Sequence, residues 1–269
     1  MPELPEMENY RILLEQRLAG QQILSANINR EKSLNTAAHT FLEQVVNQRI
    51  VVIERKAKHL LFHLDNNQFL LLHLMLGGWL YFGNDEDKPE RTIQIEISFG
   101  HFSLYFIGLR LGYLHLHSIN SASEVLRKLG PEPLNPSFTE SIFLKSIHGS
   151  KSQLKTKLVN QEFISGIGNC YSDEICFHAR LKPSRRLNEL TVEEAKQLYT
   201  SIKYVLKDAL NHGGYMEHPL YKGDQLTGGY DSICKVYDRE GEPCFRCNTT
   251  ITKEILSSKK TFYCSFCQK

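Results

Sequence analysis

The chain has 269 residues, a formal net charge of +2 and 41% hydrophobic residues, which suits one large folded domain or two ordinary ones. This composition excludes collagen-like, fibrous and disordered classes, and the small net charge does not by itself indicate a nucleic-acid binder. The longest apolar runs, such as residues 69–72, are far shorter than the roughly 20 residues of a membrane span. The acidic start also lacks the apolar core of a secretory signal, so we expect a cytoplasmic protein with no membrane partner.

The first residues combine an unusual terminus with a helix. Apolar residues recur at helical spacing over residues 4–18, and Pro5 is tolerated in a first helical turn. Removal of Met1 would expose the secondary amine of Pro2, and an α-amino group with a pKa of about 8 is partly unprotonated at neutral pH. Such an amine can add to a sugar aldehyde carbon to form an iminium, while Glu3 and Glu6 can shuttle protons. The alternative is a proline-containing start with solvated acids.

The next part of the chain, from about residue 22 to 118, predicts a β domain. Short β-like runs occur at 50–53, 60–64, 69–74, 93–97 and 102–106, and turn signals such as Asp65-Asn66-Asn67 separate them. This spacing is typical of a β-sandwich or barrel.

The second half predicts a linker followed by helices. Residues 119–136 contain Gly130-Pro131-Glu132-Pro133, which favours a linker. Helical patterns follow at 138–147, 151–160, 168–180 and 191–212, and Gly213-Gly214 ends the last one. Residues 215–233 lack periodicity, and we expect a long mobile loop there. The predicted domains are 1–130, a linker at 131–136, a helical domain at 137–233 and a cysteine-rich module at 234–269.

A glycine-rich corner lies between two of the helical patterns. Gly166-Ile167-Gly168-Asn169 permits a sharp turn, and the helix that begins after it would present free N–H groups. A helix terminus of this kind binds anions such as phosphate, and Asn169 can also donate to a phosphate oxygen. The alternative is an ordinary corner between two helices.

Four of the seven cysteines predict a metal site. Cys244, Cys247, Cys264 and Cys267 form two Cys-x2-Cys pairs that flank residues rich in β-formers. Two such turns at the end of a β-hairpin complete a tetrahedral all-sulfur site, which suits zinc. A closed four-cysteine site has no open position, so we expect one structural zinc ion per chain rather than a catalytic one.

Taken together, these motifs resemble one family. Pro2-Glu3-Leu4-Pro5-Glu6, Arg55-Lys56-Ala57-Lys58, Gly166-Ile167-Gly168-Asn169 and the cysteine hairpin occur in the order and spacing of the formamidopyrimidine-DNA glycosylase/endonuclease VIII family. The match covers the whole chain, and residues 236–244 resemble the formamidopyrimidine branch. The resemblance implies an α+β protein with an N-terminal helix, a β-sandwich, a helix-two-turns-helix domain and a zinc β-hairpin.

The resemblance also implies roles for individual residues. Pro2 would attack C1′ of a damaged nucleotide flipped out of the duplex, Glu3 would protonate the sugar ring oxygen, and Glu6 would support the site. Lys58 and Asn169 would hold phosphates that flank the lesion. Elimination from the iminium would then cut the strand, and the 215–233 loop would cap the base.

Further positions are assigned to DNA contact by the same alignment. Lys155 matches the family lysine before the glycine corner, Arg110 matches a phosphate-contacting arginine, and Lys259 stands where the zinc hairpin usually carries arginine. Lysine keeps the charge at 259 but loses the bidentate fork of arginine. The usual Asp-Gln before the glycine corner is Asn160-Gln161 here.

The sequence departs from the family where a Met, an Arg and a Phe fill the hole left by the flipped nucleotide. Leu76, Leu109 and Leu111 occupy those three positions. Leu109 cannot hydrogen-bond the orphan base, and Leu111 wedges less well than a ring. Met75 is one residue out of register, so in a strand it would face the other way.

These features leave three hypotheses. The first is a monomeric glycosylase/AP lyase that acts on damaged or distorted double-stranded DNA with weakened or altered lesion specificity. The second is an impaired member that binds branched, gapped or abasic DNA without cutting it. The third is a metal-stapled protein with no role on DNA.

Overall fold

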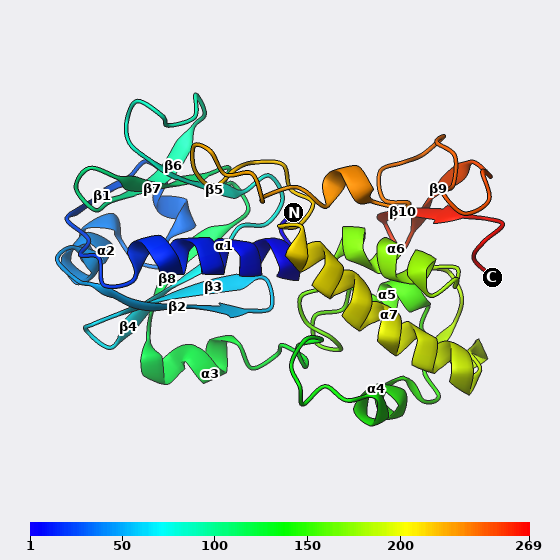
Figure 1. Ribbon diagram of the computed structural model, residues 1–269. Coiled ribbons are helices and arrows are strands. Elements are labelled where there is room, and N and C mark those ends of the chain that lie inside the picture. The colour runs from blue at the N-terminus through cyan, green and yellow to red at the C-terminus, as the bar shows by residue number, and fades with distance from the viewer. The chain divides into compact units, whose positions relative to one another are not determined.

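The computed structural model describes residues 1–269 apart from the side chain of Ser123, and Figure 1 shows its helices and strands. The helices are α1 (Leu4–Leu18), α2 (Ala38–Val45), α3 (Ala122–Val125), α4 (Glu140–Ile147), α5 (Leu154–Leu158), α6 (Asn169–His178) and α7 (Val192–Asn211). The strands are β1 (Ser25–Ile28), β2 (Ile50–Lys56), β3 (His59–Leu64), β4 (Gln68–His73), β5 (Trp79–Gly83), β6 (Ile93–Ser98), β7 (Ser103–Ile107), β8 (Tyr113–Ser118), β9 (Ile251–Leu256) and β10 (Lys259–Cys264).

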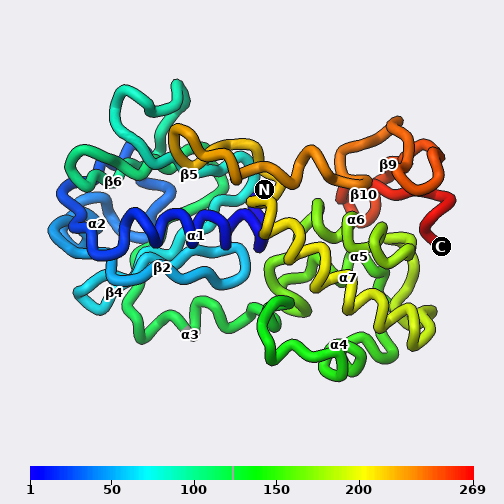
Figure 2. Tube along the Cα trace, in the orientation of Figure 1, coloured from blue at the N-terminus to red at the C-terminus, as the bar shows by residue number. Residues whose placement is uncertain are grey.

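The chain divides into two units, which are described separately. The first unit comprises residues 1–127 and 212–229, and the second comprises 128–211 and 230–269. Figure 2 follows the same path as a tube coloured along the chain. Residues 212–229, which the sequence analysis placed in the helical part, therefore pack with the first unit.

The first unit is a β-sandwich of two four-stranded antiparallel sheets, in the orders β1-β6-β7-β5 and β2-β3-β4-β8. The sandwich expected from the spacing of short strands is confirmed. Side chains alternate between the two faces of this sheet, so that Leu60, Leu72 and Leu114 lie in one apolar core with Leu14 of α1, whereas Leu61 and Leu71 belong to a separate cluster.

Helix α1 is attached to the second of these sheets by polar contacts as well as by its apolar face. The carboxylate of Glu15 accepts a hydrogen bond from the backbone N of Ile53 at 2.6 Å, and that of Glu8 accepts one from Arg55 Nε at 2.6 Å. These contacts place the N-terminal end of α1 beside the β2–β3 turn, which is where the candidate site lies.

The second unit contains α4 to α7 and the four-cysteine hairpin, residues 244–267. Helices α6 and α7 pack against each other through apolar side chains, and α7 is buried along Leu198, Ile202 and Val205. The hairpin β9–β10 turns through Ser257 and Ser258, both with positive φ, as expected of a two-residue hairpin turn.

The sequence analysis missed four elements, β1, β5, β8 and α2, and it predicted a linker where α3 forms. The strand β8 alternates leucine with tyrosine and histidine, and aromatic side chains cover its outer face. None of the helices that the structure describes is both long enough and apolar enough to cross a bilayer.

Candidate functional site

The start of α1 arranges two buried acids beside Pro2. Glu3 is the residue before the helix, and its backbone N donates to Glu6 Oε2 at 2.8 Å, which forms half of a capping box. Pro2, Glu3 and Glu6 are all buried, and Glu3 and Glu6 are only 1% and 2% exposed. Two acidic side chains are therefore held next to the chain terminus by the geometry that begins the helix.

The second oxygen of Glu6 is occupied by the segment that follows α7. Glu6 Oε1 accepts a hydrogen bond from the backbone N of Tyr215 at 2.8 Å. Gly214 has a φ of 78°, and a Cβ at this position would lie 2.2 Å from Glu6 Oε1. Only glycine fits there, so the Gly213-Gly214 pair brings this segment into contact with the acid.

Lys58 lies in the turn between β2 and β3 and faces the same acids. Its side chain is 5% exposed, and burial lowers its pKa, while the charges of Glu3 and Glu6 act in the opposite direction. Its backbone carbonyl accepts a hydrogen bond from the ring nitrogen Nδ1 of His73 at 3.0 Å, which fixes the turn. The motif Arg55-Lys56-Ala57-Lys58 thus runs from the end of β2 into the β2–β3 turn, with Ala57 at a φ of 54°.

This N-terminal cluster, Pro2 with Glu3, Glu6 and Lys58, can support acid–base chemistry. The Pro2 nitrogen becomes a secondary amine once Met1 is removed. Two carboxylates, those of Glu3 and Glu6, are buried beside it. A cation with a lowered pKa lies among them. The structure thus brings together the four residues predicted to be catalytic, and their individual roles remain predictions.

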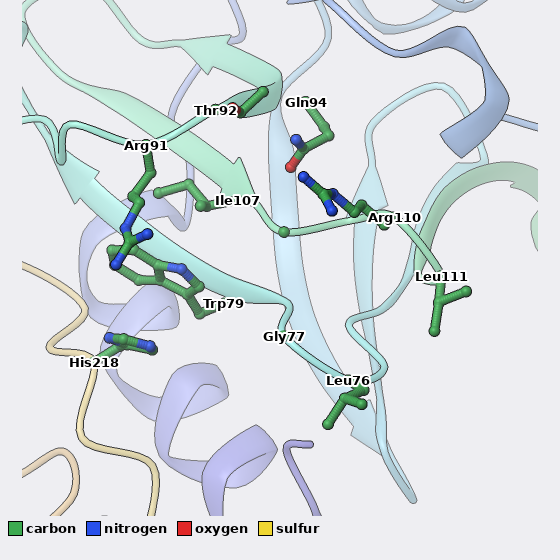
Figure 3. Close-up of a pocket in the computed structure, with 11 residues that line it drawn as sticks. Leu76, Gly77, Trp79, Arg91, Thr92, Gln94, Ile107, Arg110, Leu111 and His218 are labelled. Carbon is green, nitrogen blue, oxygen red and sulfur yellow. The ribbon is translucent and has the colours of Figure 1, made fainter.

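Two neighbouring loops of the sandwich carry exposed leucines at the edge of a pocket. The cavity measures about 610 Å³, and its lining residues include Leu76, Leu111, Arg110 and Trp79. Figure 3 shows Leu76 and Leu111 at one end and Arg91, Trp79 and His218 at the other. Trp79 and His218 stack with ring centroids 4.5 Å apart.

Leu76 and Leu111 lie beside this pocket with most of their side chains exposed. Leu76 is 69% exposed and Leu111 is 65% exposed. Gly108 shows how closely the two loops approach, because a Cβ there would lie 1.9 Å from the carbonyl oxygen of Gly77. Leu76, Leu111 and the exposed Arg110 line the same pocket, and their contact with DNA stays a prediction.

Leu109 is a correction to the sequence analysis. Its side chain is 0% exposed and belongs to the apolar core of the sandwich, so it does not reach DNA. Its backbone N donates to Gln94 Oε1 at 3.0 Å and its carbonyl accepts from Ser33 Oγ at 3.1 Å. An apolar side chain at this position gains more from the core than from solvent, which draws the middle of the loop inward.

Met75 does not lie in a strand, contrary to what the sequence analysis supposed. Strand β4 ends at His73, and Met75 adopts a positive φ of 55° in the turn that follows. Strand alternation therefore does not decide which way its side chain faces.

In the second unit, the glycine-rich corner is held by one glutamine. Gln161 Nε2 donates to the carbonyls of Val159 and Ile167 at 2.9 and 2.7 Å, and Gln161 Oε1 accepts from Gly166 N at 2.9 Å. Asn160 Oδ1 accepts from Glu162 N at 2.9 Å, so asparagine performs the turn function of the usual aspartate.

Asn169 is the first residue of α6, as predicted. Its side-chain Oδ1 is buried and lacks a hydrogen-bond partner among the described residues. The corner thus presents the N-terminal end of a 10-residue helix, where the helix dipole favours anions.

Lys155 is a second correction. Its ammonium is 1% exposed and donates to both carboxylate oxygens of Asp173 and to the carbonyl of Lys260, each at 2.7 Å. All three N–H donors are used, so Lys155 is not placed to bind a phosphate. It instead joins α5, α6 and β10 inside the second unit, and Asp173 also accepts from Phe262 N at 3.0 Å.

The four cysteines lie together, as the sequence predicted. Their sulfur atoms are all within 4.8 Å of one another, and Cys244–Cys267 and Cys247–Cys264 are 3.9 and 3.5 Å apart. A tetrahedral metal with bonds of about 2.3 Å needs sulfur atoms roughly 3.8 Å apart, so this cluster fits one. Lys259 is exposed at the start of β10 in the same hairpin.

Sequence reasoning missed several residues of these sites. Tyr215 lies 209 residues from Glu6, and Asp173 lies 18 residues from Lys155 on a different helix. The aromatic wall of the pocket, Trp79 with His218, was also missed. The Gly213-Gly214 pair was the one available signal, because two glycines after a helix indicate close backbone approach as well as a helix end.

Comparisons with known proteins point to one family. The model of the formamidopyrimidine-DNA glycosylase N-terminal domain matches residues 1–113, and that of the formamidopyrimidine-DNA glycosylase H2TH domain matches residues 129–218. The formamidopyrimidine-DNA glycosylases of Listeria innocua and Protochlamydia amoebophila are each 33% identical to this chain, with all of both chains covered.

Solved structures agree with these matches. The Lactococcus lactis Fpg in complex with DNA that contains an abasic site superposes with a TM-score of 0.92 at 28% identity, covering 99% of each chain. A point mutant of the same protein in complex with Fapy-dG DNA gives 0.92 at 28% identity, covering 100% of each chain. This chain therefore belongs to the formamidopyrimidine-DNA glycosylase family.

Proposed function

We propose that this protein is a DNA glycosylase with AP lyase activity that excises oxidised purines or processes abasic sites. The observation that carries the proposal is the N-terminal cluster, in which Glu3, Glu6 and Lys58 are buried around Pro2. The related Lactococcus lactis protein is described in complex with abasic-site DNA and with Fapy-dG DNA, which is the same class of substrate.

In the proposed reaction, the freed Pro2 nitrogen attacks C1′ of the flipped-out nucleotide and displaces the base. Glu3 protonates the sugar ring oxygen, and the iminium that results makes the 2′ hydrogen acidic enough for elimination. Glu6 holds the start of α1 and the segment at Tyr215 in place through its two hydrogen-bonded oxygens. Lys58 contributes positive charge for a flanking phosphate.

DNA contacts in this proposal come from both units. Asn169 and the amide end of α6 bind a backbone phosphate, and Lys259 and Arg110 add exposed positive charge. The four-cysteine hairpin binds one structural zinc ion, since thiolates favour zinc and a closed site has no catalytic position. The protein acts as a monomer on nucleoid DNA.

We also propose that lesion specificity is weakened or altered. Leucine at 76 and 111 provides two exposed apolar tips but no aromatic ring to stack in the opened duplex. Leu109 lies in the core and cannot read the orphan base. Because unstacking a base costs a few kcal/mol, lesions that are already mispaired or extruded should be processed best.

Borohydride trapping on DNA with one abasic site tests the proposal. The protein is first shown by mass spectrometry to have lost Met1, and we expect a covalent adduct attached through Pro2. Glu3→Gln serves as the matched control, because an abasic site has no base to release. This variant should still form the adduct but lose excision of 8-oxoguanine. A processed wild-type protein that forms no adduct contradicts the proposal.

A second candidate function is favoured by the same exposed leucines. A family member that opens the DNA duplex poorly would bind branched, gapped or abasic DNA without cutting it. Such DNA is already distorted, so no side chain has to be inserted into the base stack. Affinity for three- and four-way junctions above that for plain duplex, without any adduct or cleavage, would support this function. Equal affinity for junction and duplex would exclude it.

A further inference from the structure

Tyr215 makes contacts with the chain terminus that the family resemblance does not account for. Its hydroxyl accepts a hydrogen bond from the amino nitrogen of Met1 at 3.2 Å and donates to the carbonyl oxygen of Met1 at 3.0 Å. Its backbone N is bonded to Glu6, so the hydroxyl is positioned relative to α1. Met1, Glu6 and Tyr215 all belong to the first unit.

The Met1–Pro2 peptide bond has the same connectivity at the Pro2 nitrogen as a covalent adduct with a sugar. The carbonyl carbon of Met1 is bonded to the Pro2 nitrogen at about 1.33 Å and carries its oxygen at about 1.23 Å. In a covalent adduct with an abasic site, C1′ of the sugar is bonded to the same nitrogen. The Met1 carbonyl carbon therefore stands in for C1′, and the Met1 oxygen stands in for the oxygen substituent on that carbon.

We propose that Tyr215 is a catalytic residue that hydrogen-bonds the C1′ oxygen of an abasic sugar and donates a proton when that oxygen leaves. This inference rests on the proposed function, since it concerns the amine of Pro2 after removal of Met1. It adds a substrate preference, because the open-chain aldehyde of an abasic site carries an oxygen at this position.

Electrons and protons balance in this step. The lone pair of the Pro2 nitrogen forms a bond to C1′, the carbonyl electron pair moves to oxygen, and a proton passes from nitrogen to oxygen to give a neutral carbinolamine. The nitrogen lone pair then forms the second C–N bond while the C1′–O bond breaks. The departing oxygen takes the proton of the Tyr215 hydroxyl and leaves as water, and solvent reprotonates the phenolate.

The hydroxyl is not needed to hold this segment in place. Leu220 is fully buried and its carbonyl accepts from Phe82 N at 2.6 Å, while Thr227 Oγ1 accepts from Asn9 Nδ2 at 2.8 Å. Arg17 lies 3.7 Å from the centroid of the Tyr221 ring. These anchors remain when only the Tyr215 oxygen is removed, so Tyr215→Phe should keep the fold.

The experiment compares Tyr215→Phe with Tyr221→Phe, a hydroxyl deletion in the same segment outside the cluster. Adduct formation is followed by reduction, once with abasic-site DNA and once with deoxyribose 5-phosphate alone. We expect Tyr215→Phe to slow both by at least about tenfold, as for loss of a general acid, while DNA affinity and melting temperature stay unchanged. Added acidic buffer should accelerate the variant but not the wild type.

Each outcome decides between the two proposals. Wild-type rates for Tyr215→Phe with both aldehydes overturn the role of Tyr215 and leave the proposed function standing. A wild-type protein that reacts with deoxyribose 5-phosphate faster than the variant, but not with DNA, supports Tyr215 and contradicts the repair function. A processed wild type that forms an adduct with neither aldehyde overturns both.

Discussion

Two buried lysines, one in each unit, differ in how their surroundings compensate for burial of the charge. Lys155 is 1% exposed and places its three donors on Asp173 and a backbone carbonyl, all at 2.7 Å. Lys58 is 5% exposed beside Glu3 and Glu6, and burial outweighs these acids so that its pKa is lowered. Lys155 has its hydrogen bonds satisfied inside the second unit, whereas burial disfavours the charged form of Lys58.

This difference indicates that Lys155 stabilises the second unit, whereas Lys58 serves the candidate site of the first unit. A fully hydrogen-bonded buried pair rigidifies its surroundings, and Lys155 ties the four-cysteine hairpin to α6. A cation whose charged form is destabilised is typical of functional sites, and Lys58 lies in the N-terminal cluster. Burial alone would not have separated these two roles, because both side chains are almost equally hidden.

The largest effect is expected from loss of the proposed zinc ion, which tests whether the four cysteines hold the second unit together. Cys264→Ser removes one of the four sulfur ligands, and structural zinc contributes on the order of 10 kcal/mol to the folding of small modules. We expect loss of zinc by elemental analysis and loss of DNA binding, while the β-sandwich keeps its circular dichroism. A variant with full zinc content and wild-type affinity would contradict the assignment of the site.

Lys155→Met and Lys58→Met form the next, matched pair. Lys155→Met leaves Asp173 buried without its cation, so we expect a loss of about 3–5 kcal/mol and a melting midpoint lower by roughly 10 °C. Lys58→Met should instead preserve stability at neutral pH and reduce adduct formation.

Calorimetry and borohydride trapping measure the two effects. The double variant Lys155→Met/Asp173→Leu should recover part of the lost stability, because neither partner then leaves an uncompensated buried charge. Equal melting temperatures for both single variants would remove the distinction between the two lysines.

Substitutions at the exposed leucines should have a smaller effect, and they should raise activity rather than lower it. Leu76→Met with Leu111→Phe restores two of the residues that the family uses to fill the opened duplex, and both positions are exposed. We expect excision of 8-oxoguanine from ordinary duplex to rise about tenfold, which corresponds to roughly 1.4 kcal/mol of stacking.

The control for that test is Leu109→Arg, which restores the third family residue. Leu109 is 0% exposed, so an arginine there buries a charge and should destabilise the sandwich without any gain in excision. Single-turnover kinetics and thermal melting separate the two cases. Higher excision from a stable Leu109→Arg protein would show that this loop turns outward on DNA.

The smallest effect concerns pH. Because the pKa of Lys58 is lower in the folded protein than the ordinary 10.5, the unfolded chain binds more protons between these two values. Unfolding free energy should therefore rise with pH across this alkaline window for the wild type relative to Lys58→Met. Denaturant titrations from about pH 7 to the ordinary lysine pKa of 10.5 measure the difference, and parallel curves would show that Lys58 keeps an ordinary pKa.

Much of the fold was predictable because its signals are local. The helices at α1, α6 and α7 and the strands β2, β3, β4, β6 and β7 follow from periodicity and turn residues. The missed strands β5 and β8 contain tryptophan, tyrosine and histidine, whose burial depends on aromatic partners such as His218 on Trp79. The four cysteines were predictable because their spacing alone brings the sulfur atoms together.

The sequence by itself determined the residue types of the N-terminal cluster, the glycine corner and the metal hairpin, because short-range spacing and turn chemistry bring those residues together. Only the tertiary structure decided that Leu109 enters the core, that Lys155 pairs with Asp173, and that Tyr215 reaches Met1 across 214 positions of sequence. Such contacts depend on which apolar surfaces pack and on which buried polar groups need partners. Those are properties of the whole folded chain rather than of any one segment.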